Sequence, residues 1–141
     1  GKYVDAKATK LMATANYAVY DLMGPATDDA TTHVVETALQ AFNQASEIHY
    51  EKVSLKGKRK VRVIDVKQHV VEPITGQLQD GRVMLRVGIY QTSEGAIKPS
   101  QVWDVLGTQF HLPIDTDMML ARRVGIYHRD EQGSNQSLFE Q

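Results

Sequence analysis

The sequence of 141 residues contains no cysteine. The absence of thiols excludes disulfide bonds, a cysteine nucleophile, zinc sites built on thiolates and an iron–sulfur cluster held by this chain. A protein without cysteine is typical of a reducing compartment, and we therefore expect a cytoplasmic location.

Long apolar runs, a charged-then-apolar leader and a strong net charge are missing as well. No segment approaches the roughly 20 apolar residues that span a bilayer, so we expect no membrane partner. The net charge of −1 means that the molecule as a whole is neither a polycation nor a polyanion. Hydrophobic residues make up 42% and charged residues 23%, which is ordinary for a globular protein, and the length suits one domain with a real core.

The sequence also lacks the common motifs of metal, cofactor and catalytic sites. None of its histidines stands in the HxH or HxxxH spacing of a metal site; they are His33, His49, His69, His111 and His128. No nucleophile elbow, P-loop or dinucleotide-binding glycine pattern is present. We therefore expect no metal, no cofactor and no catalytic residue in this chain.

Asp65 and Trp103 each have a functional and a structural interpretation. Asp65 lies among cations and could act as a catalytic acid, but a structural ion pair or a turn cap is the better interpretation. Trp103 could stack on a ligand, but a tryptophan on a short helix more often belongs to the core.

The clearest strand pattern contains the first of two copies of the pentapeptide RVGIY. The copies occupy residues 86–90 and 123–127, 37 positions apart. The strand expected over residues 82–91 points its apolar residues one way, namely Val83, Leu85, Val87 and Ile89. In the second copy, Val124 and Ile126 are expected to point into the core in the same manner.

Weaker patterns predict the remaining elements. Helices are expected at about residues 29–46 and 98–107, from apolar stripes of helical spacing, a Thr-Asp-Asp start in the first and a Pro start with a Gly end in the second. Strands are expected over residues 17–23 and 48–55. Residues 60–71 are expected to be extended or partly so, with a bulge or kink at residues 63–64. For residues 17–23 a continued helix is the competing interpretation.

The order is strand, helix, strand, then strand, helix, strand, with a basic extension in the middle. It predicts an α+β fold of the ferredoxin-like, split βαβ kind, with an antiparallel sheet and helices on one face. We expect this domain over residues 17–130, a helical arm or linker over residues 1–16 and a polar tail over residues 131–141. Residues 48–55 would be the second strand, at an edge. The two RVGIY strands would run in the same direction on either side of the first strand.

Three segments carry a family resemblance: SLKGKRKVRVIDVKQHV (residues 54–70), RVMLRVGIYQTSEGAIKPSQVWDVLG (82–107) and ARRVGIYHRD (121–130). They resemble the basic turn, the strand–loop–helix unit and the closing strand of the radical-SAM-linked domain of unknown function. That family is found beside or fused to radical S-adenosylmethionine proteins. The segment KATKLMATANYAV (residues 7–19) also resembles the linker and strand that open the family's second half, which supports a strand over residues 17–23. The chain is similar to the C-terminal half of the family, with the first half absent.

The resemblance implies partners more than it implies chemistry. It suggests a context of RNA modification or maturation and a radical S-adenosylmethionine protein as a partner, and it carries over no catalytic residue. Such an enzyme needs three clustered thiolates for its cluster. This chain would therefore be an accessory domain and not the enzyme itself.

A basic stretch is the first candidate site. Seven of the 16 basic residues lie between residues 51 and 67, namely Lys52, Lys56, Lys58, Arg59, Lys60, Arg62 and Lys67. A concentrated positive charge on a nearly neutral chain suits the phosphates of RNA. The alternative is a solvated edge strand whose lysines discourage pairing with other strands.

A sheet face is the second candidate site. Its residues are Arg86, Tyr90, Arg123 and Tyr127, with Gly88 and Gly125 between them. Arginines and tyrosines on an open sheet resemble the platforms on which single-stranded RNA stacks, although the ribonucleoprotein consensus is absent. The alternative is that this face packs against the family's missing half, another protein or a second copy in a homodimer, with the glycines allowing close approach.

Overall fold

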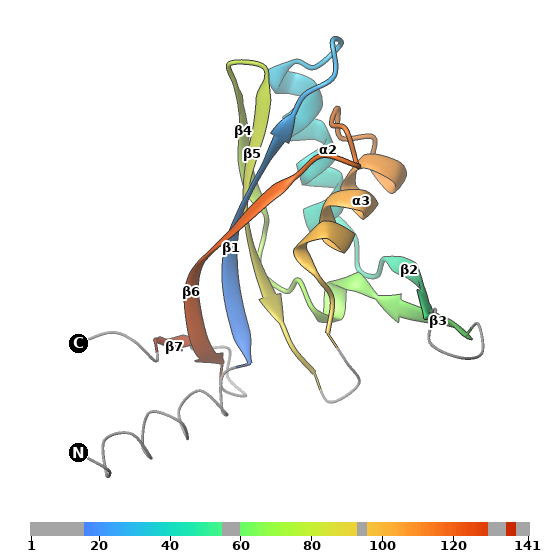
Figure 1. Cartoon of the computed structure of the whole chain (residues 1–141), viewed down its shortest axis with the longest axis vertical. Helices are drawn as coiled ribbons and strands as arrows, with labels where there is room; N and C mark the ends of the chain where they lie inside the picture. Colours follow the sequence, from blue (N-terminus) through green and yellow to red (C-terminus); the bar gives the residue numbers. More distant parts are fainter. Residues whose placement is uncertain (1–15, 55–59, 93–95, 130–134, 138–141) are drawn as a thin grey trace.

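The computed structural model describes residues 16–54, 60–92, 96–129 and 135–137 (Figure 1). The elements follow in the order β1 (Tyr17–Pro25), α2 (Thr32–Gln44), β2 (His49–Ser54), β3 (Lys60–Asp65), η1 (Val66–Gln68), β4 (Thr75–Gln79), β5 (Arg82–Tyr90), α3 (Pro99–Gln109), β6 (Leu120–Arg129) and β7 (Asn135–Ser137). The predicted helical arm lies outside the described residues except for Asn16. Within the predicted polar tail, the short strand β7 pairs with β6.

Five strands form one antiparallel sheet in the order β4-β5-β1-β6-β7. Both β5 and β6 pair antiparallel with β1, so they run parallel to each other on its two sides. Because β5 and β6 carry the two RVGIY copies, the predicted placement of the repeat is confirmed. Helices α2 and α3 lie on one face of the sheet (Figure 1), which is the predicted ferredoxin-like arrangement.

The second strand of this fold is β4, at the edge of the sheet, and not residues 48–55 as predicted. Most of that segment forms β2, which pairs with β3 in a separate two-stranded sheet. The β4–β5 hairpin closes through Asp80 and Gly81, whose φ angles are 53° and 74°. Positive φ at both positions suits the tight two-residue turn for which Asp-Gly is typical.

The chain bends after β3, and not within it. β3 pairs with β2 without a register shift from Lys60 to Asp65, so the bulge predicted at residues 63–64 is absent. At η1 the Asp65 carboxylate accepts hydrogen bonds from the backbone N–H groups of Lys67 (3.0 Å) and Ile48 (2.9 Å). The interpretation of Asp65 as a turn cap is thereby confirmed.

The core lies between the sheet and the two helices. α2 buries Val35, Ala38, Leu39 and Phe42, α3 buries Val102, Trp103, Val105 and Leu106, and β5 buries Val83, Leu85, Val87 and Ile89. The spacing of three and four residues puts each helix's apolar residues on one side. Trp103 is fully buried and its Nε1 donates to the Asp115 carbonyl at 2.9 Å, so its placement in the core is confirmed.

β6 contains an irregularity inside its copy of RVGIY. Val19 pairs with Gly125, while the next residue, Tyr20, pairs with Arg123, so Val124 is an extra residue in β6. Ile126 is buried, but Val124 is 36% exposed. The prediction that the second copy buries its valine was wrong, because this β-bulge removes Val124 from the regular alternation.

Candidate functional site

The sheet face turned away from α2 and α3 is called the open face. Cross-strand partners of an antiparallel sheet point to the same face. Across β5, β1 and β6 the open face therefore carries four rows: Tyr90–Tyr17–Tyr127, Gly88–Val19–Gly125, Arg86–Asp21–Arg122 and Met84–Met23–Leu120. β4 adds Thr75 beside Arg86 and Gln77 beside Met84.

The tyrosine row lies partly on the glycine row. A Cβ atom added at Gly88 would collide with the ring of Tyr17, and one added at Gly125 would collide with the ring of Tyr127. The centroids of these two rings are 6.3 Å apart and the rings are tilted by 52°. The glycines of both copies thus admit tyrosine rings of this same chain. Tyr17 is buried, which leaves half-buried Tyr90 and Tyr127 as the accessible aromatic residues.

The charged row centres on Asp21. Its carboxylate accepts two hydrogen bonds from Arg86, from Nε at 2.7 Å and from Nη2 at 2.9 Å. These bonds, followed by the positive charges of Arg86 and Arg122, hold the pKa of Asp21 below its ordinary value. Asp21 is therefore an anion that organises arginines, and not a proton donor. Two guanidinium groups face one carboxylate, so the row carries a net positive charge.

Neither Asp21 nor Arg122 was among the predicted site residues. The available signal was an aspartate in the middle of an apolar strand that was expected to lie between two arginine-bearing strands. Such a position favours a cross-strand ion pair.

Arg123 does not lie on the open face as predicted. Its cross-strand partner is Tyr20, which packs against the helix-side core, so Arg123 points to the helix side of the sheet. There it borders a small hollow with Tyr20, Ile97 and Ile126. The reason is the bulge at Val124, because one extra residue reverses which face each preceding side chain takes. Arg86, Tyr90 and Tyr127 do share the open face.

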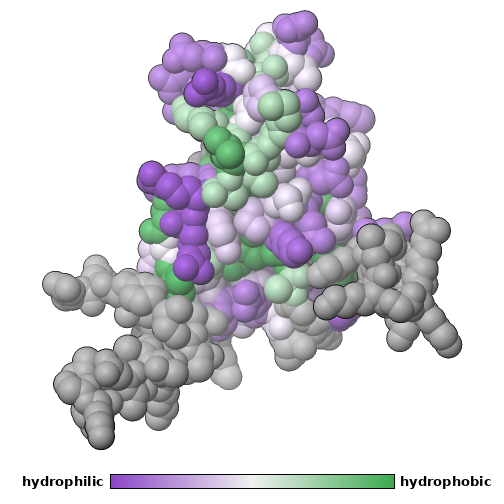
Figure 2. Space-filling view, in the orientation of Figure 1, coloured by the Kyte–Doolittle hydropathy of each residue, from purple (hydrophilic) through white to green (hydrophobic). Residues whose placement is uncertain are grey.

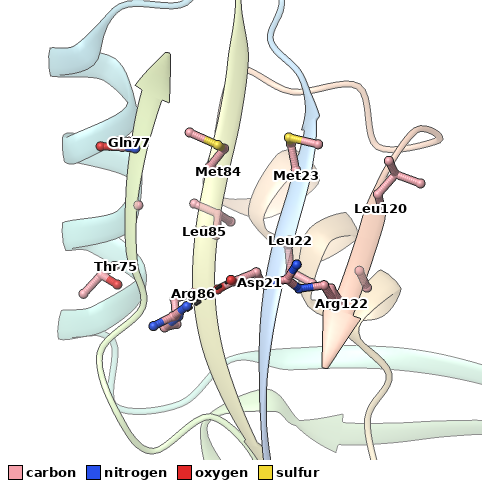
Figure 3. Close-up of a pocket in the computed structure, with 12 residues that line it drawn as sticks. Asp21, Leu22, Met23, Thr75, Gln77, Met84, Leu85, Arg86, Leu120 and Arg122 are labelled. Atoms are coloured by element: carbon pink, nitrogen blue, oxygen red, sulfur yellow. Dashed lines mark hydrogen bonds and ion pairs between the residues drawn. The ribbon is translucent and has the colours of Figure 1, made fainter. Parts of the chain in front are cut away.

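A shallow hollow of about 690 Å³ lies on the open face over the charged and apolar rows. Figure 3 shows Met84 and Met23 next to each other on β5 and β1, Leu120 on β6 beyond them, and the Arg86–Asp21 pair one row away. Leu120 is 70% exposed. Methionine is a flexible apolar side chain that adapts to different partners, so this hollow is suited to an apolar surface flanked by charge.

Three residues of the basic stretch lie on the β2–β3 hairpin, which projects from the body of the molecule (Figure 1): Lys52, Lys60 and Arg62. The backbone register places Lys52 opposite Arg62, and Lys60 opposite Ser54. Arg62 is exposed. Three members of the stretch, namely Lys56, Lys58 and Arg59, lie outside the described residues.

Lys67 is set apart from the hairpin by its contacts. Its Nζ donates to the backbone carbonyls of Phe42 (3.1 Å) and Asn43 (3.4 Å) at the end of α2, and lies 4.9 Å from the centroid of the Phe42 ring. Burial lowers the pKa of Lys67 despite the nearby negative charge of Asp65. A cation at a helix C-terminus stabilises the helix, so Lys67 has a structural role in addition to its proposed one.

The described part of the chain holds no group of three His, Asp or Glu residues that could bind a metal ion. Its most buried histidine, His69, has Nδ1 2.8 Å from the Tyr90 carbonyl oxygen, which ties η1 to the end of β5. None of the described helices has the length and apolar character needed to cross a membrane.

The fold is similar to that of a chain in the crystal structure of a Cbf5-Nop10-Gar1 complex. The two chains are 20% identical and superpose with a TM-score of 0.56 over 89% of this chain. This chain spans about a third of the other, 36% of its length, so the likeness establishes the shared fold alone. No curated protein matches the sequence.

A family model matches residues 1–99 of the chain, and its description is "Uncharacterized protein conserved in bacteria (DUF2344)". The match includes β1, α2, the two strands of the basic hairpin and β5. The description does not mention a radical S-adenosylmethionine protein, so that link stays a prediction. The chain belongs to this bacterial family.

Proposed function

We propose that this chain is a non-catalytic accessory domain of a radical-SAM-linked protein in the cytoplasm, and that it binds RNA through the β2–β3 hairpin. The observation that carries the proposal is the projection of this hairpin away from the core as a two-stranded sheet of its own. Six of the seven residues of the basic stretch lie on the hairpin or in the segment that joins its strands, all except Lys67.

A projecting basic hairpin suits the phosphate backbone of RNA for two reasons. Lysine and arginine neutralise phosphates and release counterions, which gives affinity without requiring a particular base sequence. The backbone pairing of β2 with β3 also places Lys52 opposite Arg62, so basic residues of the two strands are neighbours. An RNA strand that lies along the hairpin can contact residues of both β2 and β3 at once.

The test compares two charge-matched variants for binding of a labelled single-stranded RNA by fluorescence anisotropy at several salt concentrations. Lys58→Glu/Lys60→Glu changes the hairpin, and Arg82→Glu/Lys98→Glu changes exposed cations elsewhere by the same charge. The hairpin variant should weaken binding by roughly tenfold or more and reduce the slope of log affinity against log salt by about two. Unchanged binding in the hairpin variant, or equal losses in both variants, would contradict the proposal.

A second candidate function is the docking of a protein partner on the open face. It is favoured by the apolar row Met84–Met23–Leu120, in which Leu120 is 70% exposed. Exposed apolar side chains gathered in one area are typical of protein interfaces. Such a domain would be structural, holding a partner enzyme or a second copy of itself.

A further inference from the structure

The outer edge of β6 is only partly paired. On its inner side β6 pairs with β1 from Leu120 to Tyr127, whereas on its outer side β7 reaches only residues 127–129. Across the described residues, no strand pairs with the outer edge of residues 120–126. A free sheet edge presents unpaired N–H and C=O groups that can take up another strand.

The residues along this edge are unusually exposed for a sheet. Residues 120–124 are all exposed, and they include Leu120, Arg122, Arg123 and Val124. The space-filling view shows hydrophobic and hydrophilic residues interspersed on the visible face (Figure 2). The edge therefore offers backbone hydrogen bonds, apolar surface and positive charge together.

We propose that the free edge of β6 binds an extended acidic–apolar peptide segment of a protein partner, added to the sheet as a further strand. The proposal rests on the second candidate function above, partner docking, and is independent of RNA binding by the hairpin. It names the surface, the mode of binding and the chemistry of the partner.

The two arginines determine the acidic part of the partner. Arg122 lies on the open face and Arg123 on the helix side, so consecutive residues present a cation on each face of the sheet. Both oxygens of the Asp21 carboxylate accept hydrogen bonds from Arg86. The negative charge of Asp21 is therefore already paired, and Arg122 can attract a further anion. Side chains of an added strand alternate in the same way, so two adjacent acidic residues would meet the two arginines.

Leu120 determines the apolar part of the partner. It lies on the open face two residues before Arg122, next to Met23. A partner strand running antiparallel to β6 would therefore have the order acidic, acidic, any residue, apolar. The bulge at Val124 ends the regular ladder, which confines the match to about residues 120–123.

Two other occupants fit the edge less well. A second copy pairing antiparallel around a two-fold axis would set the arginines of one β6 close to those of the other, and like charges across strands are destabilising. An RNA strand could contact the two guanidinium groups, but it would leave the apolar surface of Leu120 and the free backbone groups of the edge unused.

The test uses a fluorescein-labelled peptide containing Glu-Asp-Ser-Val, with flanking Gly and Ser residues, and measures its binding by fluorescence polarisation. Binding should weaken by roughly tenfold for Arg122→Glu/Arg123→Glu and change less than about twofold for the charge-matched Arg82→Glu/Lys98→Glu. A peptide methylated on alternate backbone nitrogens should bind at least about tenfold more weakly, because it cannot complete the ladder. Circular dichroism checks that each variant is folded.

Several results would overturn the proposal. Equal binding of the methylated peptide would exclude strand addition. Loss of binding in Met84→Lys but not in the double arginine variant would place the peptide in the open-face hollow, which leaves partner docking intact while removing the edge as its site. Displacement of the peptide by RNA would assign the edge to RNA. Self-association through β6 without peptide binding would assign it to a second copy. Lys58→Glu/Lys60→Glu should bind the peptide normally, whatever happens to RNA binding.

Discussion

The two copies of RVGIY have the same five residues in different surroundings. In β5, the copy lies between β4 and β1, Val87 and Ile89 are buried, and Arg86 holds Asp21. In β6, the copy lies near the outside of the sheet, its valine is the extra residue of a bulge, and its arginine points to the opposite face. Both copies still place a glycine under a tyrosine ring.

The difference shows that neighbouring strands decide what an identical local sequence does. β5 is paired on both sides, so its alternation cannot slip without exposing the core residues. β6 is paired on both sides only near its end, so an extra residue can be accommodated where little apolar surface depends on it. Three comparisons of matched substitutions test this account, in order of decreasing effect.

The largest difference is expected between the two valines. Val87→Ala should lower the free energy of unfolding by about 2–3 kcal/mol, because it removes buried methyl groups and leaves a cavity. Val124→Ala should cost less than about 0.5 kcal/mol, because this side chain is already partly in water. Urea denaturation of both variants measures the contrast. Equal costs would mean that the bulge does not take Val124 out of the core.

The next difference is expected between the two glycines. Gly88→Ala should cost about 2 kcal/mol, since the new methyl group collides with the buried ring of Tyr17. Gly125→Ala should cost about 1 kcal/mol or less, because the half-buried ring of Tyr127 can move aside. A double-mutant cycle is the control, in which Gly88→Ala should cost less in a Tyr17→Ala background. A cost unchanged by that background would show that the ring is not the cause.

The smallest difference is expected between the two arginines, and it should depend on pH. The pKa of Asp21 is lowered in the folded state by Arg86, so the pair's stabilisation is present above the unfolded pKa, near 3.8, and is lost as pH falls through the folded pKa. Because the pair is exposed, Arg86→Gln should lower the free energy of unfolding only slightly at pH 7, and this small loss should disappear in strong acid.

Arg123→Gln is the matched control for that comparison, because Arg123 lies on the other face from Asp21. Its effect on the free energy of unfolding should be within about 0.5 kcal/mol and should not change between pH 7 and acid. Urea denaturation at a series of pH values measures both variants. A similar pH dependence in the two would show that Asp21 does not distinguish them.

The elements with strong periodicity were the ones that sequence predicted well. The core-facing apolar residues of β5 alternate from Val83 to Ile89 and are all buried. α2 shows an apolar stripe together with a capping residue, Thr31, that accepts a hydrogen bond from the backbone N–H of Val34. Patterns of this kind report burial directly, because one face must be apolar wherever the element covers a core. Trp103 was likewise predicted correctly as a core residue, because it lies on the apolar side of α3.

β4 was missed because an edge strand with a mostly exposed surface has little apolar pattern. Its residues are polar or glycine apart from Leu78, which is half-buried. The turn that follows it, Asp80-Gly81, is nevertheless a strong hairpin signal, and it identifies residues 75–79 as the partner of β5. The candidate sites were predicted less completely than the fold, since the roles of Asp21, Arg122 and the edge of β6 depend on which strands are neighbours.

The sequence by itself determined the exclusion of thiol chemistry, the apolar faces of α2, α3 and β5, and the concentration of positive charge before residue 67. Each of these depends on composition or on a local period. Only the tertiary structure decided that Arg122, and not Arg123, faces Asp21 across the sheet. The physical reason is that side chains of a strand alternate with a period of two, so one bulged residue, Val124, exchanges the two faces for every residue before it.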